Sequence, residues 1–141
     1  MRPVLVLLAG LGLPGLALAQ PRPFNCVGAE QLEDDSFAIP FAPRAAMPGD
    51  AARGNLAAIA ALAKAAPDRL LCVLGHAGPQ EGGANTGTQL AARRAGAVAS
   101  ALAALGVERD RIRAEAHVAR FARGGVVPAE RSVTVVVLPA R

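Results

Sequence analysis

The sequence contains no tryptophan and no tyrosine, and Lys64 is the only lysine among its fifteen basic residues. Nucleic-acid-binding domains gather basic residues on one face, often with aromatic residues between them. The arginines of this chain are instead scattered, so a nucleic acid is not expected as a partner. Guanidinium groups bind carboxylates and phosphates in bidentate geometry, which makes the arginine bias compatible with anionic ligands. A biased genome, which makes the whole chain rich in arginine and alanine, is the simpler explanation of the arginine bias.

The sequence also lacks the common motifs of metal and catalytic sites. Its two histidines and two cysteines show no H-x-x-x-H or C-x-x-C spacing, so a zinc site is not expected. None of the three serines lies in a G-x-S-x-G nucleophile elbow. The glycine-rich segment 75–83 lacks the Lys-Ser/Thr pair of a phosphate-binding P-loop. We therefore expect no cofactor and no enzymatic activity.

The first nineteen residues have the pattern of a cleavable signal peptide. Arg2 precedes an uncharged apolar stretch, which ends in the small-x-small triplet Ala17-Leu18-Ala19. The stretch is shorter than the ~20 apolar residues of a membrane-spanning helix, and Pro14 interrupts it, so a retained anchor is the less favoured alternative. A lipoprotein is not expected either, because the polar stretch 20–25 separates the apolar region from the first cysteine. The sequence thus predicts that the mature protein is exported.

The predicted mature chain has 122 residues and a net charge of +3, from 14 basic and 11 acidic residues, which suits a single domain with one core. Residues 20–36 are polar and irregular and are predicted to form an N-terminal extension, followed by a domain at 37–141. The two cysteines are Cys26 and Cys72. In an oxidising compartment an even number of cysteines usually pairs, so a disulfide is favoured over a free thiol at Cys72 in an apolar strand.

The hydrophobic pattern predicts six elements in the order β-α-β-α-β-β: a strand at 37–41, a helix from an N-cap at Asp50 to Pro67, a strand at 70–74, a helix at 88–105, and strands at 112–118 and 132–138. Gly106 is expected to end the second helix as its C′ residue. The strand at 112–118 alternates, with Ile112, Ala114, Ala116 and Val118 expected on one face. The run 70–74 is continuously apolar, as in a strand that is covered on both faces. The fold class that follows is α/β, an α+β sandwich with two helices packed on a mixed four-stranded sheet.

One residue of the second predicted helix does not match the face on which it lies. At about 100° per residue, Arg94 falls in the apolar sector of Leu90, Val98 and Leu102, whereas Arg93 points away. A guanidinium cannot neutralise itself, so a buried one must find carboxylates or carbonyls, or extend past the helix into solvent. Two hypotheses follow: Arg94 reaches solvent beside the glycine-rich segment, or it binds an anionic ligand. Helical geometry alone favours the first.

Several segments together resemble the OmpA C-terminal-like, peptidoglycan-binding family. The family pattern of G-H-T-D, a glycine-rich loop with an Asn, and then L-S-x-x-R-A is similar to Gly75-His76-Ala77-Gly78, Asn85 and Leu90-Ala91-Ala92-Arg93-Arg94-Ala95. The family's opening strand V-x-F is matched by Ile39-Pro40-Phe41, and its closing N-R-R-V-E-I, more loosely, by Glu130-Arg131-Ser132-Val133-Thr134-Val135. The resemblance covers residues 37–138 and includes the predicted order of elements.

The resemblance implies a binding site for the diaminopimelate residue of the peptidoglycan stem peptide. In the family an Asp holds the ammonium of this residue and an Arg holds its carboxylate. The Arg carries over to Arg94, with Asn85 and Arg131 nearby, which favours the ligand hypothesis for Arg94. The Asp position falls on Gly78, so the carboxylate that would hold the ammonium is missing there. His76 occupies a family position usually filled by His or an aromatic residue, so the resemblance implies a structural role for it.

Two other carboxylates, Glu81 and Glu130, are candidates to replace the missing Asp from different positions. The function implied is a non-enzymatic periplasmic module that binds peptidoglycan at a degenerate site. The resemblance also implies association with the outer membrane or cell wall. The alternative is a structural or interaction module of the cell envelope that keeps the fold, has lost peptidoglycan binding and acts through an envelope protein partner.

Overall fold

The computed structural model describes residues 10, 23–78, 80–81, 84–117 and 131–141. The predicted signal peptide, apart from Gly10, lies outside the described residues, as does Glu130. The elements are β1 (Ser36–Pro40), α1 (Arg53–Ala65), β2 (Leu71–Gly75), α2 (Ala84–Ala104), β3 (Ile112–Ala116) and β4 (Ser132–Val137), with short 3-10 helices at Ala29–Gln31, Asp50–Ala52 and Arg109–Arg111.

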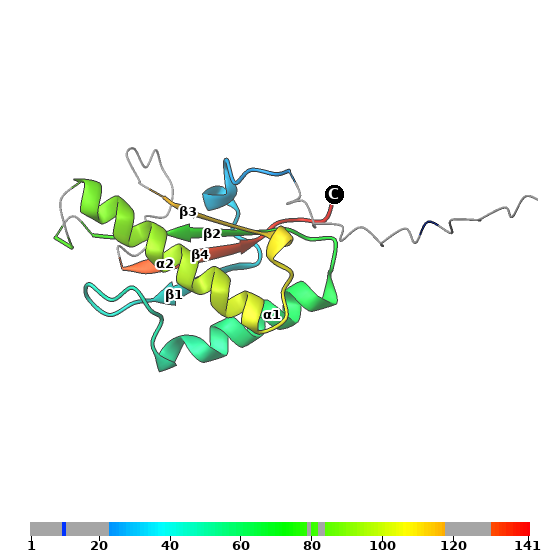
Figure 1. The fold of residues 1–141 in the computed structure, drawn as a ribbon, viewed down its shortest axis with the longest axis horizontal. Helices are drawn as coiled ribbons and strands as arrows, with labels where there is room; N and C mark the ends of the chain where they lie inside the picture. The colour runs from blue at the N-terminus through cyan, green and yellow to red at the C-terminus, as the bar shows by residue number, and fades with distance from the viewer. Residues whose placement is uncertain (1–9, 11–22, 79, 82–83, 118–130) are drawn as a thin grey trace, which may run out of the picture.

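The four strands form one sheet in the order β1-β4-β2-β3 (Figure 1). β4 is antiparallel to both of its neighbours, and β2 is parallel to β3. The sheet is therefore mixed, and the two helices pack on it, which confirms the predicted fold class and element order. β1 is an edge strand, as Pro40 requires, because a proline cannot donate a hydrogen bond within a sheet.

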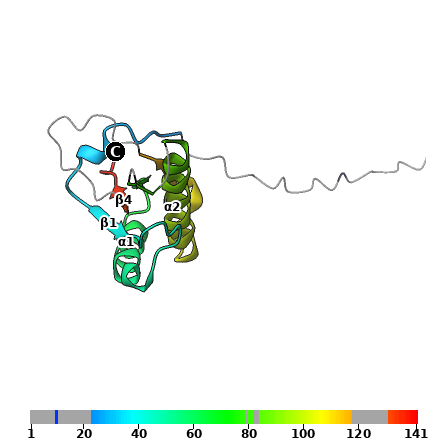
Figure 2. The same ribbon diagram turned by 90° about the vertical axis from the view of Figure 1, so that its left-hand side faces the viewer.

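The sheet is covered on both faces. Figure 2 shows α1 and α2 on one side and the N-terminal segment, coloured blue, on the other. The core under the helices consists mainly of Ile39, Phe41, Leu56, Ile59, Leu71, Val73, Val98, Leu102, Val133, Val135 and Val137. A smaller core on the opposite face joins Cys26 and Ala29 to Cys72, Leu74 and Val136. The prediction that the second strand is covered on both faces is confirmed, and its second cover is the N-terminal extension.

The two cysteines form a disulfide between the extension and the middle of the sheet. The Cys26–Cys72 Cα atoms lie 5.8 Å apart, and both residues are almost fully buried. The disulfide that the sequence favoured over a free thiol at Cys72 is therefore present. It holds the extension against β2, because Cys72 belongs to the face of β2 that points away from the helices.

Two local predictions need correction. Asp50 is not the N-cap of α1, because the chain first forms a 3-10 turn over Asp50–Ala52, and the Asp50 carboxylate pairs with Arg53 at 3.2 Å. The alternation predicted for the third strand is weak, since Ala114 is exposed. β3 is an edge strand and has less cover than the strands inside the sheet.

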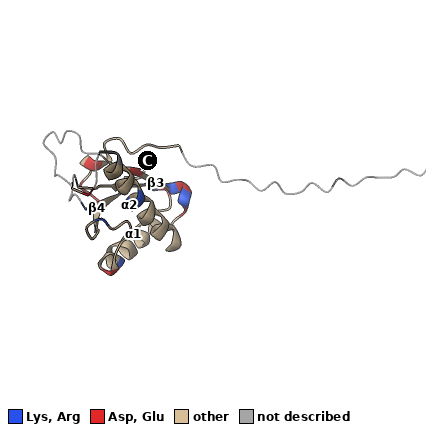
Figure 3. Ribbon diagram, turned by 60° about the vertical axis from the view of Figure 1, so that its left-hand side comes forward, with Lys and Arg blue, Asp and Glu red and all other residues tan. Residues whose placement is uncertain are grey.

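Helix α2 is longer than predicted and begins four residues earlier, at Ala84. Its C-terminus is the one expected, at Gly106, which has a φ of 102°. The Gly106 N–H donates to the Ala103 carbonyl and the Val107 N–H to the Leu102 carbonyl, which is the Schellman pattern. Both helices are largely uncharged along their length (Figure 3), so a charged residue on their buried side stands out.

Candidate carboxylate-binding site

Arg94 lies in α2 on the side that faces the sheet, and its side chain is completely buried. Arg93 is exposed, as the helical spacing predicts. The guanidinium carbon of Arg94 lies 5.3 Å from the centre of the Phe41 ring, within the range of a cation–π contact. The structure thus confirms that Arg94 belongs to the buried face, and it does not reach solvent as the simpler hypothesis expected.

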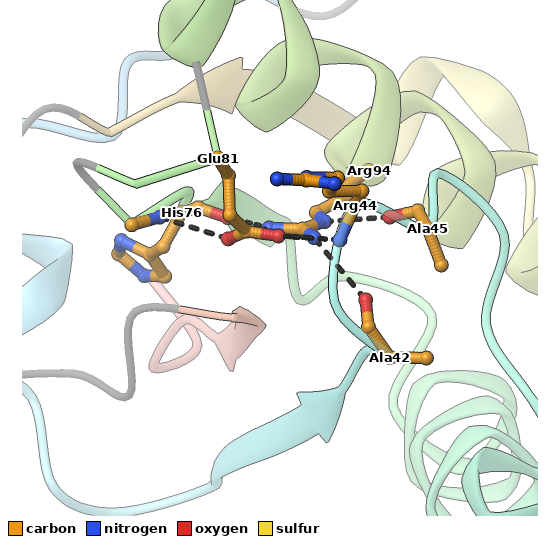
Figure 4. A network of polar contacts seen from close by, with 7 residues as sticks. Ala42, Arg44, Ala45, His76, Glu81 and Arg94 are labelled. Atoms are coloured by element: carbon orange, nitrogen blue, oxygen red, sulfur yellow. Dashed lines mark hydrogen bonds and ion pairs between the residues drawn. The ribbon is translucent and has the colours of Figure 1, made fainter.

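Main-chain carbonyls hold the Arg94 guanidinium in a fixed orientation (Figure 4). Nε donates to the Ala45 carbonyl at 2.8 Å, and Nη1 donates to the His76 carbonyl at 2.9 Å. Nη2 makes a longer contact of 3.4 Å with the Ala42 carbonyl. These acceptors come from the loop after β1 and from the end of β2, so the site forms where two distant segments meet the second helix.

The carboxylate of Glu81 occupies the centre of the site. It binds Arg94 in bidentate geometry, with Nη1 donating to Oε1 at 2.9 Å and Nη2 donating to Oε2. The main-chain N–H of Gly78 donates to Oε1 at 2.9 Å, and that of Arg44 donates to Oε2 at 2.7 Å. Four N–H groups therefore converge on one carboxylate, which is the arrangement of a carboxylate receptor.

These contacts stabilise the ionised form of Glu81 and lower its pKa to about 2. The largest cause is the hydrogen bonding to Arg94; the Gly78 and Arg44 N–H groups add to it, and burial opposes it. A carboxyl whose folded pKa lies below its usual value of 4.5 stabilises the fold above pH 4.5. That contribution is lost as the pH falls from 4.5 toward 2, so the Arg94–Glu81 ion pair persists at every physiological pH.

Arg44 presents its amide to the site through an unusual backbone conformation. Its φ is 61°, in the left-handed region, which costs a residue with a side chain about 1 kcal/mol. The Ala45 N–H closes a turn onto the Ala42 carbonyl at 3.0 Å. The turn thereby points one N–H and two carbonyls at the site. Unfavourable backbone geometry of this kind is concentrated at functional sites.

His76 is buried beside the site and supports it from the sheet side. Its Nε2 shares a hydrogen bond of 3.1 Å with Thr134 Oγ1, its N–H donates to the Ser132 carbonyl, and its own carbonyl accepts from Arg94. Burial, with a smaller contribution from the charge of His117, lowers the pKa of His76 to about 4. These contacts agree with the structural role predicted for this residue.

The lowered pKa of His76 predicts a loss of stability in mild acid. The unfolded chain binds a proton at this residue near pH 6.5, whereas the folded protein does so only near pH 4. The contribution of neutral His76 to the free energy of unfolding is therefore complete above pH 6.5. It declines between pH 6.5 and pH 4, by at most about 3 kcal/mol. Urea unfolding at pH 7 and pH 4.8 would measure the decline, and His76→Gln should flatten it. An equal slope in the variant would show that another group causes it.

The structure brings together some of the predicted site residues. Gly78 lies at the site and contributes its N–H to the Glu81 carboxylate. Asn85 lies in the first turn of α2, and its side chain lies outside the described part of the structure. The side chain of Arg131 is exposed, while its carbonyl accepts from the Phe41 N–H at 2.8 Å.

Two contributors were not fully predicted. Glu81 was one of two candidates for a replacement carboxylate, and it lies directly on Arg94. Arg44 was missed, because it acts through its main-chain amide, for which a sequence carries no residue-specific signal. Its neighbours Pro43 and Pro48-Gly49 indicate turns but not their direction.

Neither a metal centre nor a membrane helix is found in the parts of the chain that the structure describes. Within those parts no three His, Cys, Asp or Glu side chains are grouped as metal ligands. The described helices are also too short or too polar to cross a bilayer.

The chain is similar to OmpA-like domains in fold. It resembles the OmpA-like domain of FopA1 from Francisella tularensis, with 20% identity, a TM-score of 0.60, and coverage of 77% of this chain and 79% of that one. It also resembles the peptidoglycan-associated lipoprotein from Burkholderia pseudomallei, with 21% identity, a TM-score of 0.59, and coverage of 72% of this chain and 87% of that one. An outer membrane protein from Borrelia burgdorferi is similar with 23% identity, a TM-score of 0.60, and coverage of 74% of this chain and 87% of that one.

Evidence for the family comes from the sequence itself. No curated protein matches the chain by sequence. A sequence profile of the OmpA family, however, matches residues 44–127, more than half of the chain, from the turn at Arg44 through α2 and β3. This match includes Arg94 and Glu81. The chain therefore belongs to the OmpA family.

Proposed function

We propose that this protein is a non-enzymatic module of the bacterial cell envelope that binds peptidoglycan non-covalently, with a carboxylate of the stem peptide held by Arg94. The observation that carries the proposal is the convergence of four N–H groups on one carboxylate position. Membership of the OmpA family supports the class of ligand, since one protein of similar fold is a peptidoglycan-associated lipoprotein.

The chemistry of the site suits a carboxylate that must be held without being transformed. The guanidinium of Arg94 is planar, permanently charged and already oriented by carbonyls, so a carboxylate binds it without further ordering of the side chain. Burial strengthens the attraction, because the local dielectric constant is lower than that of water. A stem-peptide residue such as diaminopimelate offers the carboxylate that this fork requires.

The proposal places the protein in the periplasm. Residues 1–19 would direct export, 20–36 would form the extension, and 37–141 would form the OmpA-like domain. The buried Cys26–Cys72 disulfide supports this location, because disulfides form and persist in oxidising compartments such as the bacterial periplasm.

A second candidate function is an envelope interaction module that has lost peptidoglycan binding and acts through a protein partner. The observation that favours it is the Arg94–Glu81 ion pair, which already satisfies the guanidinium within the chain. The two functions differ in whether peptidoglycan can reach Arg94, and a single binding experiment separates them.

Sedimentation with purified sacculi tests the proposed function. We expect the wild-type protein to sediment with sacculi, and Arg94→Ala to reduce its affinity at least about tenfold, because loss of a charge-assisted bidentate contact costs more than 1.4 kcal/mol. Arg93→Ala is the matched control, since this exposed neighbour lies on the other side of the same helix. It should bind as the wild type does.

A folding control belongs to the same experiment, because Arg94 is buried and its removal leaves Glu81 unpaired. Arg94→Lys keeps the charge without the bidentate fork, and circular dichroism would report whether either variant is folded. Wild-type protein that stays in the supernatant would overturn the proposal and favour the interaction module. Equal sedimentation of wild type and a folded Arg94 variant would place the binding surface elsewhere.

A further inference from the structure

We infer that Glu81 is an internal occupant of the carboxylate site, so that a ligand carboxylate binds Arg94 only by displacing it. The inference rests on the proposed function for the identity of the natural ligand, but the site itself can be tested with a simple carboxylate. The ligand expected to compete with Glu81 is any carboxylate small enough to accept the same four N–H groups.

Arg94 has no hydrogen-bond donor left for a second carboxylate. A guanidinium carries five N–H groups. One donates to Ala45, two on Nη1 reach His76 and Glu81, and two on Nη2 reach Ala42 and Glu81. Because the three carbonyls belong to the folded main chain, Glu81 is the only one of these acceptors that a side-chain rotation can remove.

Most of the groups that surround the carboxylate position do not depend on Glu81. The Ala42 and Ala45 carbonyls, which help to orient Arg94, and the Arg44 N–H belong to one turn that is far from Glu81 in sequence. When the Glu81 carboxylate leaves, this turn should keep its position, and the N–H groups of Arg44 and Arg94 that bound the carboxylate need another acceptor. An empty site would contain a buried charge without a partner, which is costly, so an exogenous carboxylate is expected to fill it.

Glu81 lies nearer to solvent than Arg94 does. Its side chain is 7% exposed, whereas that of Arg94 is fully buried. In Figure 4 the Glu81 side chain extends from the segment before α2 onto the guanidinium. Glu81 thus lies at the more accessible side of the ion pair, and a ligand that approaches from solvent meets it first.

Glu81 competes strongly with an external ligand because it is attached to the same chain as Arg94. A group joined by a short segment acts at an effective concentration in the millimolar range or above. A ligand's apparent affinity falls by the fraction of molecules in which the site is open. Removing the internal carboxylate should therefore raise the affinity for an external one, and it also removes a negative charge that repels the ligand.

Acetate is the probe for the site itself. In Glu81→Ala we expect the melting temperature to fall below that of the wild type and to recover saturably as sodium acetate is added, relative to sodium chloride at equal ionic strength. The wild type should show no saturable response. Glu81→Gln, which keeps the size of the side chain, serves if the alanine variant does not fold. Glu115→Ala is the matched control, because Glu115 pairs with Arg113 on β3 at 3.1 Å, and its response should equal that of the wild type.

Sacculus binding completes the experiment and separates the inference from the proposed function. We expect Glu81→Ala to bind sacculi at least about tenfold more tightly than the wild type. Acetate rescue of the Glu81 variants without sacculus binding by any protein would support the internal occupant and overturn peptidoglycan as the ligand. Arg94-dependent sacculus binding that Glu81→Ala does not increase, with no acetate response, would overturn the internal occupant and leave the proposed function standing.

Discussion

Replacing Gly75 with alanine is expected to destabilise the domain by about 3 kcal/mol or more, at the upper end of what overpacking usually costs. A Cβ atom at this position would lie 1.9 Å from the Ala91 carbonyl oxygen and 2.8 Å from its carbon. Neither atom belongs to a flexible side chain. Because Gly75 ends β2, which is paired on both sides, relief requires α2 to move away from the sheet.

The same movement would disturb the carboxylate site, since Ala91 lies about one helical turn before Arg94. We therefore expect Gly75→Ala to weaken the contacts of Arg94 as well as the fold. Urea unfolding followed by circular dichroism would measure the loss of stability. Gly96→Ala is the matched control, because Gly96 is exposed in α2 and has nothing within 4 Å of an added Cβ. It should be neutral or stabilise by up to about 1 kcal/mol, and a Gly75 variant as stable as this control would contradict the prediction.

Removing the disulfide is expected to cost about 4 kcal/mol, the loop-closure value for a cross-link that spans 46 residues. The Cys26→Ala, Cys72→Ala double variant avoids a free thiol. Loss of the bond also releases the segment that covers the second face of the sheet, where Leu74 and Val136 pack against Cys26 and Ala29. The free energy of unfolding of a folded domain is typically ~5–15 kcal/mol, so the expected loss of about 4 kcal/mol is a large fraction of it.

Urea unfolding of the double variant and of the reduced wild type would test the prediction. Both should be destabilised by similar amounts, and a reducing agent should have no effect on the double variant. If the double variant unfolds at the same urea concentration as the oxidised wild type, the extension contributes little to stability and the bond serves another purpose.

A second arginine, Arg111, is also buried. Its hydrogen-bond partners differ from those of Arg94 in a way that separates a structural role from a binding site. Arg111 donates to the carbonyls of Ala63, Ala66 and Arg69 and pairs with Glu108, whose side chain is 60% exposed. Its main contacts satisfy carbonyls at the end of α1 and just beyond it, which is a structural task. Arg94 differs because two main-chain N–H groups join it around the same carboxylate.

Local features of the sequence were sufficient to predict the order of the elements and the exceptional position of Arg94. Helical and strand periodicity are properties of short segments, so they reveal which face a residue occupies without knowledge of its neighbours in space. The placement of Arg94 on the buried face, the end of α2 at Gly106 and the cover on both faces of β2 followed from such patterns.

The tertiary structure alone decided what Arg94 binds. Its partners come from the turn after β1, the end of β2 and Glu81, and two of these segments are distant from it in sequence. Most of these partners act through main-chain atoms, whose direction depends on turn geometry such as the positive φ of Arg44. The resemblance aligns Gly78 with the family's Asp, and only the fold shows that Gly78 contributes its N–H to the Glu81 carboxylate. The sequence alone therefore located the arginine, and the packing of distant segments supplied the receptor around it.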